Sequence, residues 1–540
     1  MARFVALPAS QCHLLPYSRL AGQIDHSTIA SITVRVRSRG DLRELKELVE
    51  TQGSQVPTRR KYLTRAAFAS RYGARPDDLD AVERYASGHN LLIERRSAAE
   101  RVLKLRGEMG DILRAFPAHV RLYHHAHGTY RGRSGEIQVP AHLSEIVTGI
   151  FGFDTRPLRR RGFRQRVSNG GPGGDNGVAA SFFAQRYNFP VEYNGKKLDG
   201  AGQSIGIVEL GGGYDVKDLQ DYFSTVKAPV PNVVPVSAGA DNSPGSSSDG
   251  EVMLDLEVAG TVAPAANLAV YFGTNTGQGF RNAVSAAVHD DQRQIDVISI
   301  SWGSPEPRGG ITQEVLDFNS IFLEAASLGI TVCVATGDYG TADNEPANWD
   351  RQIHVDYPAS DPYVIACGGT QIDQTSGQDV VWNDNEPFDP DLPDSGGWTT
   401  GGGISKCFTD IPNYQKNANL PVSIDGNTQG RGVPDLAMSA TNYFVQVDQA
   451  VYASGGTSAV APLMAALVAL CNQAKNKRSG YLNPVLYANP QVFHDVVSGN
   501  NTIPPSASGT DGAQGYSAGQ GWDACTGLGT PNGTAILNLL

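Results

Sequence analysis

No run of about 18 or more apolar residues occurs in this chain of 540 residues, so the sequence predicts no membrane-spanning helix. The first residues lack a clean apolar segment after Arg3, which makes them a poor export signal. The six cysteines form no C-x-x-C pair, and a chain of this length needs no disulfide framework. We expect mostly free, buried thiols; one or two bridges among the last five cysteines are the alternative.

Acidic residues are scarce in the first third of the chain, and basic residues are scarce in the rest. Residues 1–170 contain 29 Lys and Arg against 16 Asp and Glu, a charge of +13, whereas residues 171–540 contain 15 against 39, a charge of −24. A basic segment can bind nucleic acid, but these arginines are scattered among acidic and apolar residues. We therefore expect the two parts to dock on each other, with protonation of the acidic part weakening the contact.

The first part of the chain has the pattern of a small α/β module. Residues 27–50 read as a strand followed by a helix, and residues 76–87 and 98–106 have apolar positions near helical spacing. Residues 119–138 turn strand-like. Together these segments predict one compact domain.

Residues 156–177 change from arginine-rich to glycine- and asparagine-rich sequence. Such a segment is typical of an exposed linker that proteases cut easily. We expect an N-terminal domain over 1–153, a linker over 154–178 that is processed between 160 and 180, and a second domain over 179–540.

In the second domain, short β-branched runs alternate with helix-like segments. The runs include 204–208, 268–272, 297–301, 331–335 and 364–366, and we expect helices over 214–226, 251–261, 278–289, 312–328 and 458–474. Apolar strands separated by helices predict a doubly wound α/β fold, with a parallel sheet covered on both faces.

The sharpest chemical signal is GGTSAVAP, residues 455–462, followed by an apolar run. This string places Ser458 at the start of a buried helix, where backbone N–H groups and the helix dipole favour a developing oxyanion. A plain helix-capping serine is the alternative. The string resembles the nucleophile motif of subtilisins and sedolisins.

A serine nucleophile needs a base, and the candidate is a carboxylate because no histidine fits. After residue 170 the histidines are His289, His354 and His494, and none has an H-G-T-H-like setting. Glu251 and Asp255 lie four residues apart, on one face of an apolar helix. Two close, buried carboxyl groups should titrate as a pair that shares a proton.

From about residue 207 onward the chain resembles the sedolisin family, the serine-carboxyl peptidases. The strings that carry the resemblance are IVELGGGY (207–214), DGEVMLDLEVAG (249–260), VISISWGSPE (297–306), ATGDYG (335–340), HVDYP (354–358), TGGGIS (400–405), GRGVPD (430–435), GGTSAVAP (455–462), FHDVVSGNN (493–501) and AGQGWDACTGLGTP (518–531). Two N-terminal strings, KYLTRAAFASRYG and DAVERYA, resemble the family's pro-domain. The resemblance implies a subtilisin-like catalytic domain behind an inhibitory pro-domain.

The resemblance also implies the catalytic roles. Glu251 is then the general base for Ser458 and Asp255 its orienting partner, while Asp338 stabilises the oxyanion. In addition, Glu209 extends the proton network and Trp302 packs against it. A carboxylic acid that donates to an oxyanion must stay protonated, so we expect activity in acid and near-silence well above neutral pH.

One further site follows from the resemblance, and a second is predicted from a glycine-rich string and a nearby aspartate. One calcium ion would be held near the C-terminus by the side chains of Asp495 and Asp523 and by carbonyl groups, those of Val496, Gly519 and Gly521. Substrate would lie against the glycine string Gly401, Gly402 and Gly403 as an added strand, with Asp356 near the pocket for the residue before the cut. Asp356 would favour basic residues there.

The sequence thus predicts a secreted acid endopeptidase, made as a zymogen and acting through an acyl-enzyme. Its partners would be polypeptide substrates and its own pro-domain, with neither nucleic acid nor membrane, and the processed enzyme would be a monomer. Three alternatives stay open: a histidine-based subtilisin-like protease, an inactive binding protein on this fold, and a nucleotide-dependent enzyme suggested by the LGGGY string. The last is weak, since G-x-G-x-x-G is absent.

Overall fold

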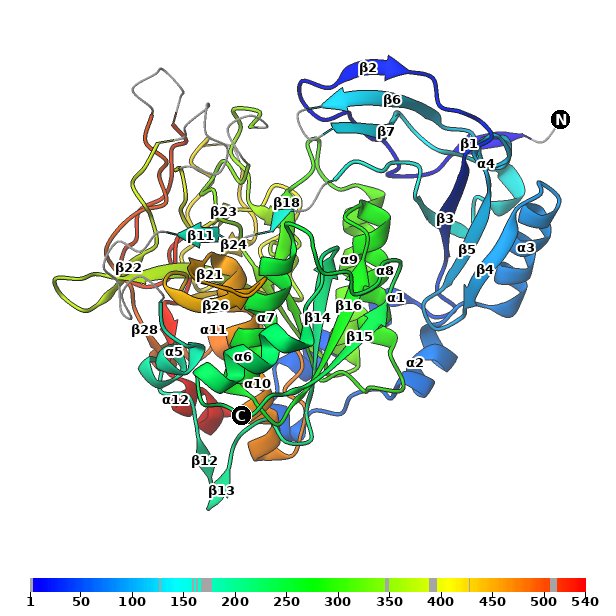
Figure 1. Cartoon of the computed structure of the whole chain (residues 1–540). Coiled ribbons are helices and arrows are strands. Elements are labelled where there is room, and N and C mark those ends of the chain that lie inside the picture. The colour runs from blue at the N-terminus through cyan, green and yellow to red at the C-terminus, as the bar shows by residue number, and fades with distance from the viewer. Residues whose placement is uncertain are drawn as a thin grey trace.

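The computed structural model describes residues 3–125, 128–157, 160–161, 164–166, 177–344, 349–387, 396–426, 428–505 and 512–540. In Figure 1 the N-terminal module, residues 3–157, lies at the upper right against a larger C-terminal unit, residues 177–540. All six cysteines are free thiols, five of them buried.

The centre of the C-terminal unit is an eight-stranded sheet of order β15-β16-β14-β17-β19-β21-β22, with β25 also paired to β21. These strands are β14 (Ser204–Leu210), β15 (Asn232–Ser237), β16 (Asn267–Gly273), β17 (Val297–Ile300), β19 (Thr331–Ala335), β21 (Ile365–Ile372), β22 (Asp379–Val381) and β25 (Leu436–Ser439). All pairings are parallel except that of β22, which is antiparallel to β21 at the edge.

Helices cover both faces of this sheet (Figure 1), which confirms the doubly wound prediction. They are α5 (Ala180–Arg186), α6 (Val216–Thr225), α7 (Asp249–Val262), α8 (Gly277–His289), α9 (Gln313–Ser327), α10 (Val460–Lys475), α11 (Asn483–Tyr487) and α12 (Gly533–Leu539). Side chains of β14 alternate between two cores: Ile205 and Ile207 join the core of α7 and α10, whereas Val208 and Leu210 join that of α8 and α9.

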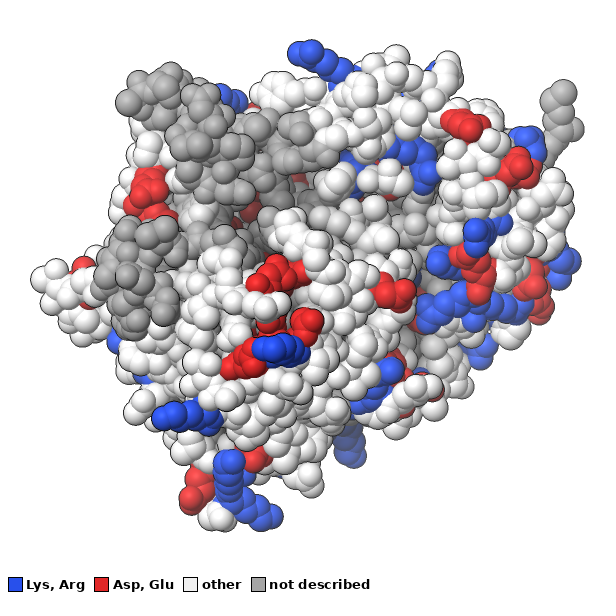
Figure 2. Space-filling model, viewed as in Figure 1, with Lys and Arg blue, Asp and Glu red and all other residues white. Residues whose placement is uncertain are grey.

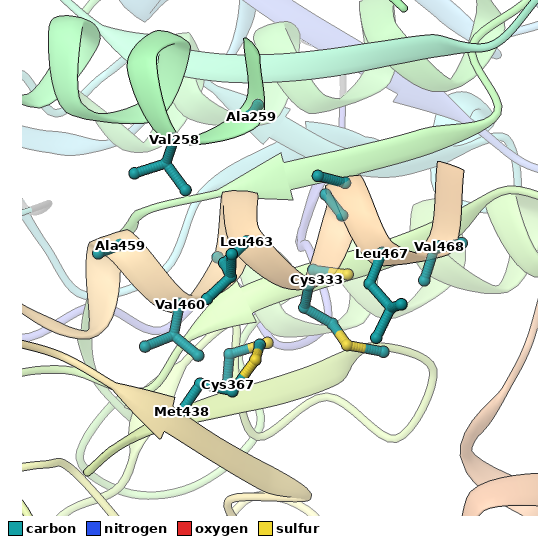
Figure 3. Packing of buried hydrophobic residues seen from close by; sticks show 14 of the residues in the cluster. Val258, Ala259, Cys333, Cys367, Met438, Ala459, Val460, Leu463, Leu467 and Val468 are labelled. Atoms are coloured by element: carbon teal, nitrogen blue, oxygen red, sulfur yellow. The ribbon is translucent and has the colours of Figure 1, made fainter. Parts of the chain in front are cut away.

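The helices α7 and α10 are core elements rather than surface helices. Val258 and Ala259 of α7 lie near Val460 and Leu463 of α10, and Figure 3 shows Cys333 from the sheet in the same cluster. The segment Thr457–Lys475 is long and apolar enough to cross a bilayer, although the sequence shows no continuous apolar run. However, 89% of it is buried inside the protein, so its apolar side chains have a core to fill.

The N-terminal module contains a four-stranded antiparallel sheet of order β4-β5-β3-β9 and a three-stranded sheet of order β2-β6-β7. Its elements are β1 (Phe4–Ala6), β2 (Arg19–Gly22), β3 (Ile29–Val36), α1 (Leu42–Gly53), α2 (Arg65–Tyr72), α3 (Pro76–Ser87), β4 (Leu92–Ser97), β5 (Val102–Glu108), α4 (Met109–Ala115), β6 (His119–His125), β7 (Gly128–Ser134), β8 (Gln138–Pro140) and β9 (Val147–Phe151).

The helix expected over 98–106 is wrong, because most of this segment belongs to strand β5. Seven residues of β5 pair with β3, from Val102 opposite Arg35 to Glu108 opposite Ile29. Leu103 and Leu105, which alternate along the strand, are fully buried. The apolar residues of this segment have a spacing near that of a helix, but pairing with β3 on one side and β4 on the other stabilises a strand instead.

Buried ion pairs join the module to the C-terminal unit. Arg35 and Arg101 of the module each contact the carboxylate of Glu324 on α9, and Arg35 also pairs with Asp317 at 2.7 Å. His289 of α8 contacts the second oxygen of Glu324 at 2.9 Å. The basic module therefore meets the acidic unit through complementary charges. On the visible face, Figure 2 also shows acidic side chains gathered over α6 and α7.

Two short strands of the linker pair with the C-terminal unit. Strand β10 (Arg160–Arg161) is antiparallel to β18 (Trp302–Pro305), and β11 (Arg164–Arg166) is antiparallel to β27 (Ala450–Gly455). Strand β27 forms a hairpin with β26 (Tyr443–Val447) and leads into Ser458. The remaining short strands are β12 (Glu192–Tyr193), β13 (Lys196–Lys197), β20 (Asp356–Tyr357), β23 (Gly403–Ile404), β24 (Gly432–Val433), β28 (Phe493–His494) and β29 (Thr530–Pro531). Most of the expected processing range, 160–180, lies outside the described residues.

Candidate active site

Ser458 lies in the short 3-10 turn Thr457–Ala459, directly before the first residue of α10. The turn follows Gly456, whose φ of 116° suits glycine. The Ser458 hydroxyl donates to the carbonyl of Ser301 at 3.3 Å, and the residue is 1% exposed. Its position at a helix N-terminus gives it nearby N–H groups and a favourable dipole for negative charge.

Asp255 on α7 is linked to the same point through Ser301. The Ser301 hydroxyl lies 2.8 and 2.9 Å from the two oxygens of Asp255 and 3.1 Å from the carbonyl of Ser458. Ser301 directly follows β17, at the carboxyl end of a central strand, where sites of parallel sheets commonly lie. The structure therefore brings Asp255 and Ser458 together across one serine.

Glu209, at the carboxyl end of β14, joins this group of acids. Its carboxylate accepts a hydrogen bond from the indole N–H of Trp302 at 2.9 Å. Burial, and next the charge of Glu251, raise the pKa of Glu209 well above its usual value. Burial raises the pKa of Asp255 in the same direction, followed by the charges of Glu209 and Glu251. Three fully buried carboxyl groups thus interact and cannot all ionise at low cost.

Asp338 contacts the residue before the serine. One of its oxygens accepts hydrogen bonds from the backbone N–H and the hydroxyl of Thr457, both at 2.8 Å. The Thr457 hydroxyl is also 3.2 Å from the carbonyl of Gly337. The loop after β19 is thereby tied to the Ser458 turn, and Asp338 is only 5% exposed.

A small cavity of about 30 Å³ opens beside Ser458, and Asp338, Asp343 and Asp356 line it. A Cβ atom built on Gly303 would lie 2.2 Å from both carboxylate oxygens of Asp356, so a side chain at this position of β18 would displace Asp356. A larger cavity of about 1030 Å³ lies between the N-terminal module and the same face. The Ser458 turn therefore borders an acidic pocket at the edge of the domain contact.

The three glycines at 401–403 pack against the Asp338 loop. The Gly401 N–H donates to the carbonyl of Gly337 at 2.8 Å, and Gly403 pairs with Val433 in a two-stranded ladder. A Cβ on Gly401 would lie 1.8 Å from the Thr336 carbonyl. The edges that pair with the linker are those of β18 and β27, not this string.

The expected calcium residues converge in the C-terminal loops. Asp495 accepts a hydrogen bond from the Gly521 N–H at 2.8 Å, and Asp523 accepts one from the Gly519 N–H at 3.2 Å. A Cβ on either glycine would meet nothing within 4 Å, so space is open beside the loop. Within the described ranges no three His, Cys, Asp or Glu side chains group as a metal site, and here the other donors would be carbonyls.

Sequence reasoning did not single out Ser301, Thr457 or Asp343. Ser301 precedes Trp302 in the string that was recognised, and Thr457 precedes Ser458, so adjacency to these motifs was the available signal. His289 and His354 are engaged elsewhere: the former contacts Glu324 and the latter Asp350, both at 2.9 Å.

A doubly wound sheet with a buried serine at a helix N-terminus, surrounded by carboxyl groups, defines a subtilisin-like serine peptidase of the carboxyl-dependent class. Comparisons with known proteins agree with this. Residues 16–156 match the model of the pro-kumamolisin activation domain, and residues 235–496 match that of the subtilase family. Kumamolisin of Bacillus sp. strain MN-32 is 43% identical over 94% of this chain and 91% of its own length.

Sedolisin of Pseudomonas sp. strain 101 is 26% identical over 94% of this chain and 86% of its own length. The solved structure of Pseudomonas sedolisin, a serine-carboxyl proteinase complexed with two molecules of pseudo-iodotyrostatin, matches with a TM-score of 0.55 at 26% identity. That match covers 67% of this chain and 97% of the sedolisin chain. The protein belongs to the sedolisin family of serine-carboxyl peptidases and is an acid-acting serine endopeptidase with an N-terminal activation domain.

Proposed function

We propose that Ser458 is the nucleophile and that Glu251, Asp255 and Asp338 act on it in the roles expected from the sequence. The observation that supports this most is the link from the Ser458 backbone and hydroxyl through Ser301 to the carboxylate of Asp255. Glu251 lies one helical turn before Asp255 on α7 and interacts electrostatically with it. Glu209 and Trp302 extend the network.

In the reaction, Glu251 takes the proton of the Ser458 hydroxyl as its oxygen bonds to the peptide carbonyl carbon. The carbonyl oxygen becomes an anion, which protonated Asp338 stabilises by donating a hydrogen bond. Glu251 then returns the proton to the leaving amine, the C–N bond breaks, and an acyl-enzyme remains. Water, deprotonated by Glu251, attacks the ester, and Ser458 recovers its proton as the acid product leaves.

The buried carboxyl groups account for activity in acid. The raised pKa values of Glu209 and Asp255 mean that the cluster holds protons up to a higher pH than ordinary carboxyl groups do. As pH rises, the cluster gains negative charge close to the position of the oxyanion. This charge opposes oxyanion stabilisation, so activity falls as pH rises.

We also propose that residues 1–153 are the inhibitory pro-domain, 154–178 the linker and 179–540 the catalytic domain. Strand β10 pairs Arg161 with Trp302 on one side of Ser458, and β11 pairs Arg164 with Gly455 on the other. Because these two strands pair on either side of Ser458, we propose that the first self-cleavage falls between Arg161 and Arg164. Mass spectrometry of the two products formed in acid tests this; termini that begin after Arg166 would contradict it.

The small acidic cavity is the proposed pocket for the residue before the cut, and Asp356 would select a basic side chain there. Substrate would also bind beside three glycines that lie against the Asp338 loop, Gly401, Gly402 and Gly403. A side chain on Gly401 would collide with this loop and displace it. A peptide library scanned at that position measures the preference. Equal cleavage after arginine and leucine would remove Asp356 from this role.

One calcium ion would be held by Asp495, Asp523 and the carbonyls of Val496, Gly519 and Gly521. The donors fit calcium because all are oxygen atoms, the loop is rich in glycine and open space lies beside it. The ion would hold two loops together and would take no part in the reaction. We further propose that the enzyme is secreted and works as a monomer on polypeptides, without nucleic acid or a membrane.

The test of the function compares the full-length protein with Ser458→Ala and Glu251→Gln in mild acid and at neutral pH. Chain mass reports self-processing, and digestion of denatured protein reports turnover. Wild type should process and digest in acid only, and both variants should do neither. The exposed serine variant Ser376→Ala is the matched control. Retained activity in Ser458→Ala would refute the assignment, and activity that peaks above neutral pH would favour a histidine base.

A further inference from the structure

Glu257 is a buried carboxyl group on the catalytic helix that takes no part in the catalytic cluster. It lies two residues after Asp255 on α7, which places it about 200° around the helix axis from that residue. Its side chain is 0% exposed. A buried carboxyl group is costly unless it has a partner, so its position calls for a physical reason.

The partner of Glu257 is the edge of the β26–β27 hairpin. Its two oxygens lie 3.1 and 3.3 Å from the backbone N–H of Gln446 in β26, its only hydrogen-bond donor among the described residues. The neighbouring N–H groups on this edge are also capped. Phe444 donates to the Val178 carbonyl at 2.8 Å, and Gln449 donates to Asp218 at 3.2 Å.

The opposite edge of the same hairpin meets the linker and the nucleophile. Strand β27 pairs through Ala453, Ser454 and Gly455 with linker residues 164–166, and three residues later the chain reaches Ser458. If cleavage falls between Arg161 and Arg164, β27 binds the residues that follow the scissile bond. The contact of Glu257 thus fixes the strand on which the leaving part of the substrate lies.

We propose that Glu257, in its protonated form, is a positioning residue for the β26–β27 hairpin and thereby for substrate residues after the cut. The inference rests on the proposed function, which makes Ser458 the nucleophile. A neutral carboxyl group accepts the Gln446 N–H through its carbonyl oxygen, as an amide would. An ionised one places a charge among apolar side chains, which weakens the packing of α7 on the hairpin.

The charged groups around Glu257 favour this protonated form. Asp218 and Tyr222 face it from α6, Gln446 faces it from β26, and Glu251 and Asp255 share its helix. Burial raises the pKa of Glu257 well above its usual value, and Asp218 adds to the shift. A carboxyl group with a raised pKa stabilises the fold at low pH, and this contribution is lost as pH rises from about 4.3 towards the folded pKa.

Two substrates separate a positioning role from a structural one. The first is a peptide that extends four residues on both sides of the cut. The second is a nitroanilide with the same residues before the cut and none after it. Self-processed wild type, Glu257→Gln and Glu257→Leu are compared in acid, and Asp218→Asn, which alters the same hairpin edge at Gln449, is the matched control.

With the Leu variant we expect kcat/KM for the long peptide to fall about tenfold or more, the size expected when a buried N–H loses its acceptor. The nitroanilide should change less than about threefold, and Glu257→Gln should restore the long peptide. The ratio of kcat/KM for the long peptide to kcat/KM for the nitroanilide gives a second readout. As pH rises, this ratio should fall in wild type and in Asp218→Asn but stay constant in Glu257→Gln.

Equal losses on both substrates, or identical pH dependence of the ratio in wild type and Glu257→Gln, would overturn the proposal. If the Leu variant does not fold, the pH dependence of the Gln variant alone decides. Wild type that cleaves neither substrate would overturn the proposed function as well.

Discussion

Glu324 is the carboxylate on which the contact between the pro-domain and the catalytic domain depends most. It is 0% exposed and receives Arg35 at 2.7 Å, the guanidinium of Arg101, and Ser320 at 3.1 Å. Burial opposes its ionisation, but Arg101, Arg35 and His289 together hold its pKa well below the usual value. We predict that Glu324→Gln releases the pro-domain.

The magnitude follows from the burial of the partners. Arg101 is 3% exposed and has Glu324 as its only ion-pair partner in the described structure, so the substitution removes the ion-pair partner of a buried cation. Such a change costs about 3–5 kcal/mol, or about 100- to 4,000-fold in a binding constant. By contrast, Glu94 of the module is 25% exposed and pairs with Lys104 and Arg106 near the surface, where a pair is worth about 0–1 kcal/mol.

The assay uses the self-cleaved enzyme that still holds its pro-domain. Dilution of this complex at about pH 5.5, above the usual pKa of carboxyl groups, yields an inhibition constant from the recovered activity. Glu324→Gln should raise that constant at least about 100-fold, and the control Glu94→Gln should change it less than about fivefold. A rise of less than about tenfold, or equal effects of the two variants, would refute the reasoning.

Four further predictions follow from the site. Asp338→Ala should lower kcat about 100- to 1,000-fold in acid, while Asp338→Asn, which donates without a titrating proton, should keep more activity and a flatter pH profile. Trp302→Phe removes the hydrogen bond that lowers the pKa of Glu209 and should shift the pH profile of kcat, not merely the melting temperature. Asp356→Ala should abolish a preference for arginine before the cut, measured as a ratio of kcat/KM values. A chelator should lower the melting temperature of wild type and leave Asp495→Ala unaffected; an unchanged wild type would remove the calcium site.

Much of the fold could be predicted because the pattern was local. The β-branched runs that became β14, β16, β17 and β19 are apolar on both faces, as strands inside a covered parallel sheet must be. The strand β15 was missed because no residue of Asn232–Ser237 is buried at the sheet edge and the segment carries a proline. Strand β5 was misread because its pairing with β3, which is distant in sequence, leaves no mark on the local apolar pattern.

The candidate site could be predicted only as far as motifs reach. Glu251, Asp255 and Ser458 stand in recognisable strings, and the structure brings Asp255 and Ser458 together through Ser301. Ser301 was not singled out, because a serine at a strand end has no pattern of its own and only its place beside Trp302 marks it. Asp343 was missed for a similar reason: it reaches the cavity beside Ser458 only through the turn after Asp338.

The buried carboxyl groups fall into two classes, and their opposite responses to pH explain how one chain can be stored and then activated. Glu324 lies between arginines and has a lowered pKa, so it stabilises docking above its undocked pKa and loses this effect as pH falls. Among the described residues, Glu209, Asp255 and Glu257 have no such cation, and their pKa values are raised. They therefore stabilise the catalytic domain in acid and lose that effect as pH rises. Acid therefore weakens the contact that holds the pro-domain while it favours the protonated carboxyl groups that stabilise the catalytic domain. Because the arginines of the first class belong to the pro-domain, its departure leaves the catalytic domain with mainly the second class, and the mature enzyme should tolerate neutral pH less well than its precursor.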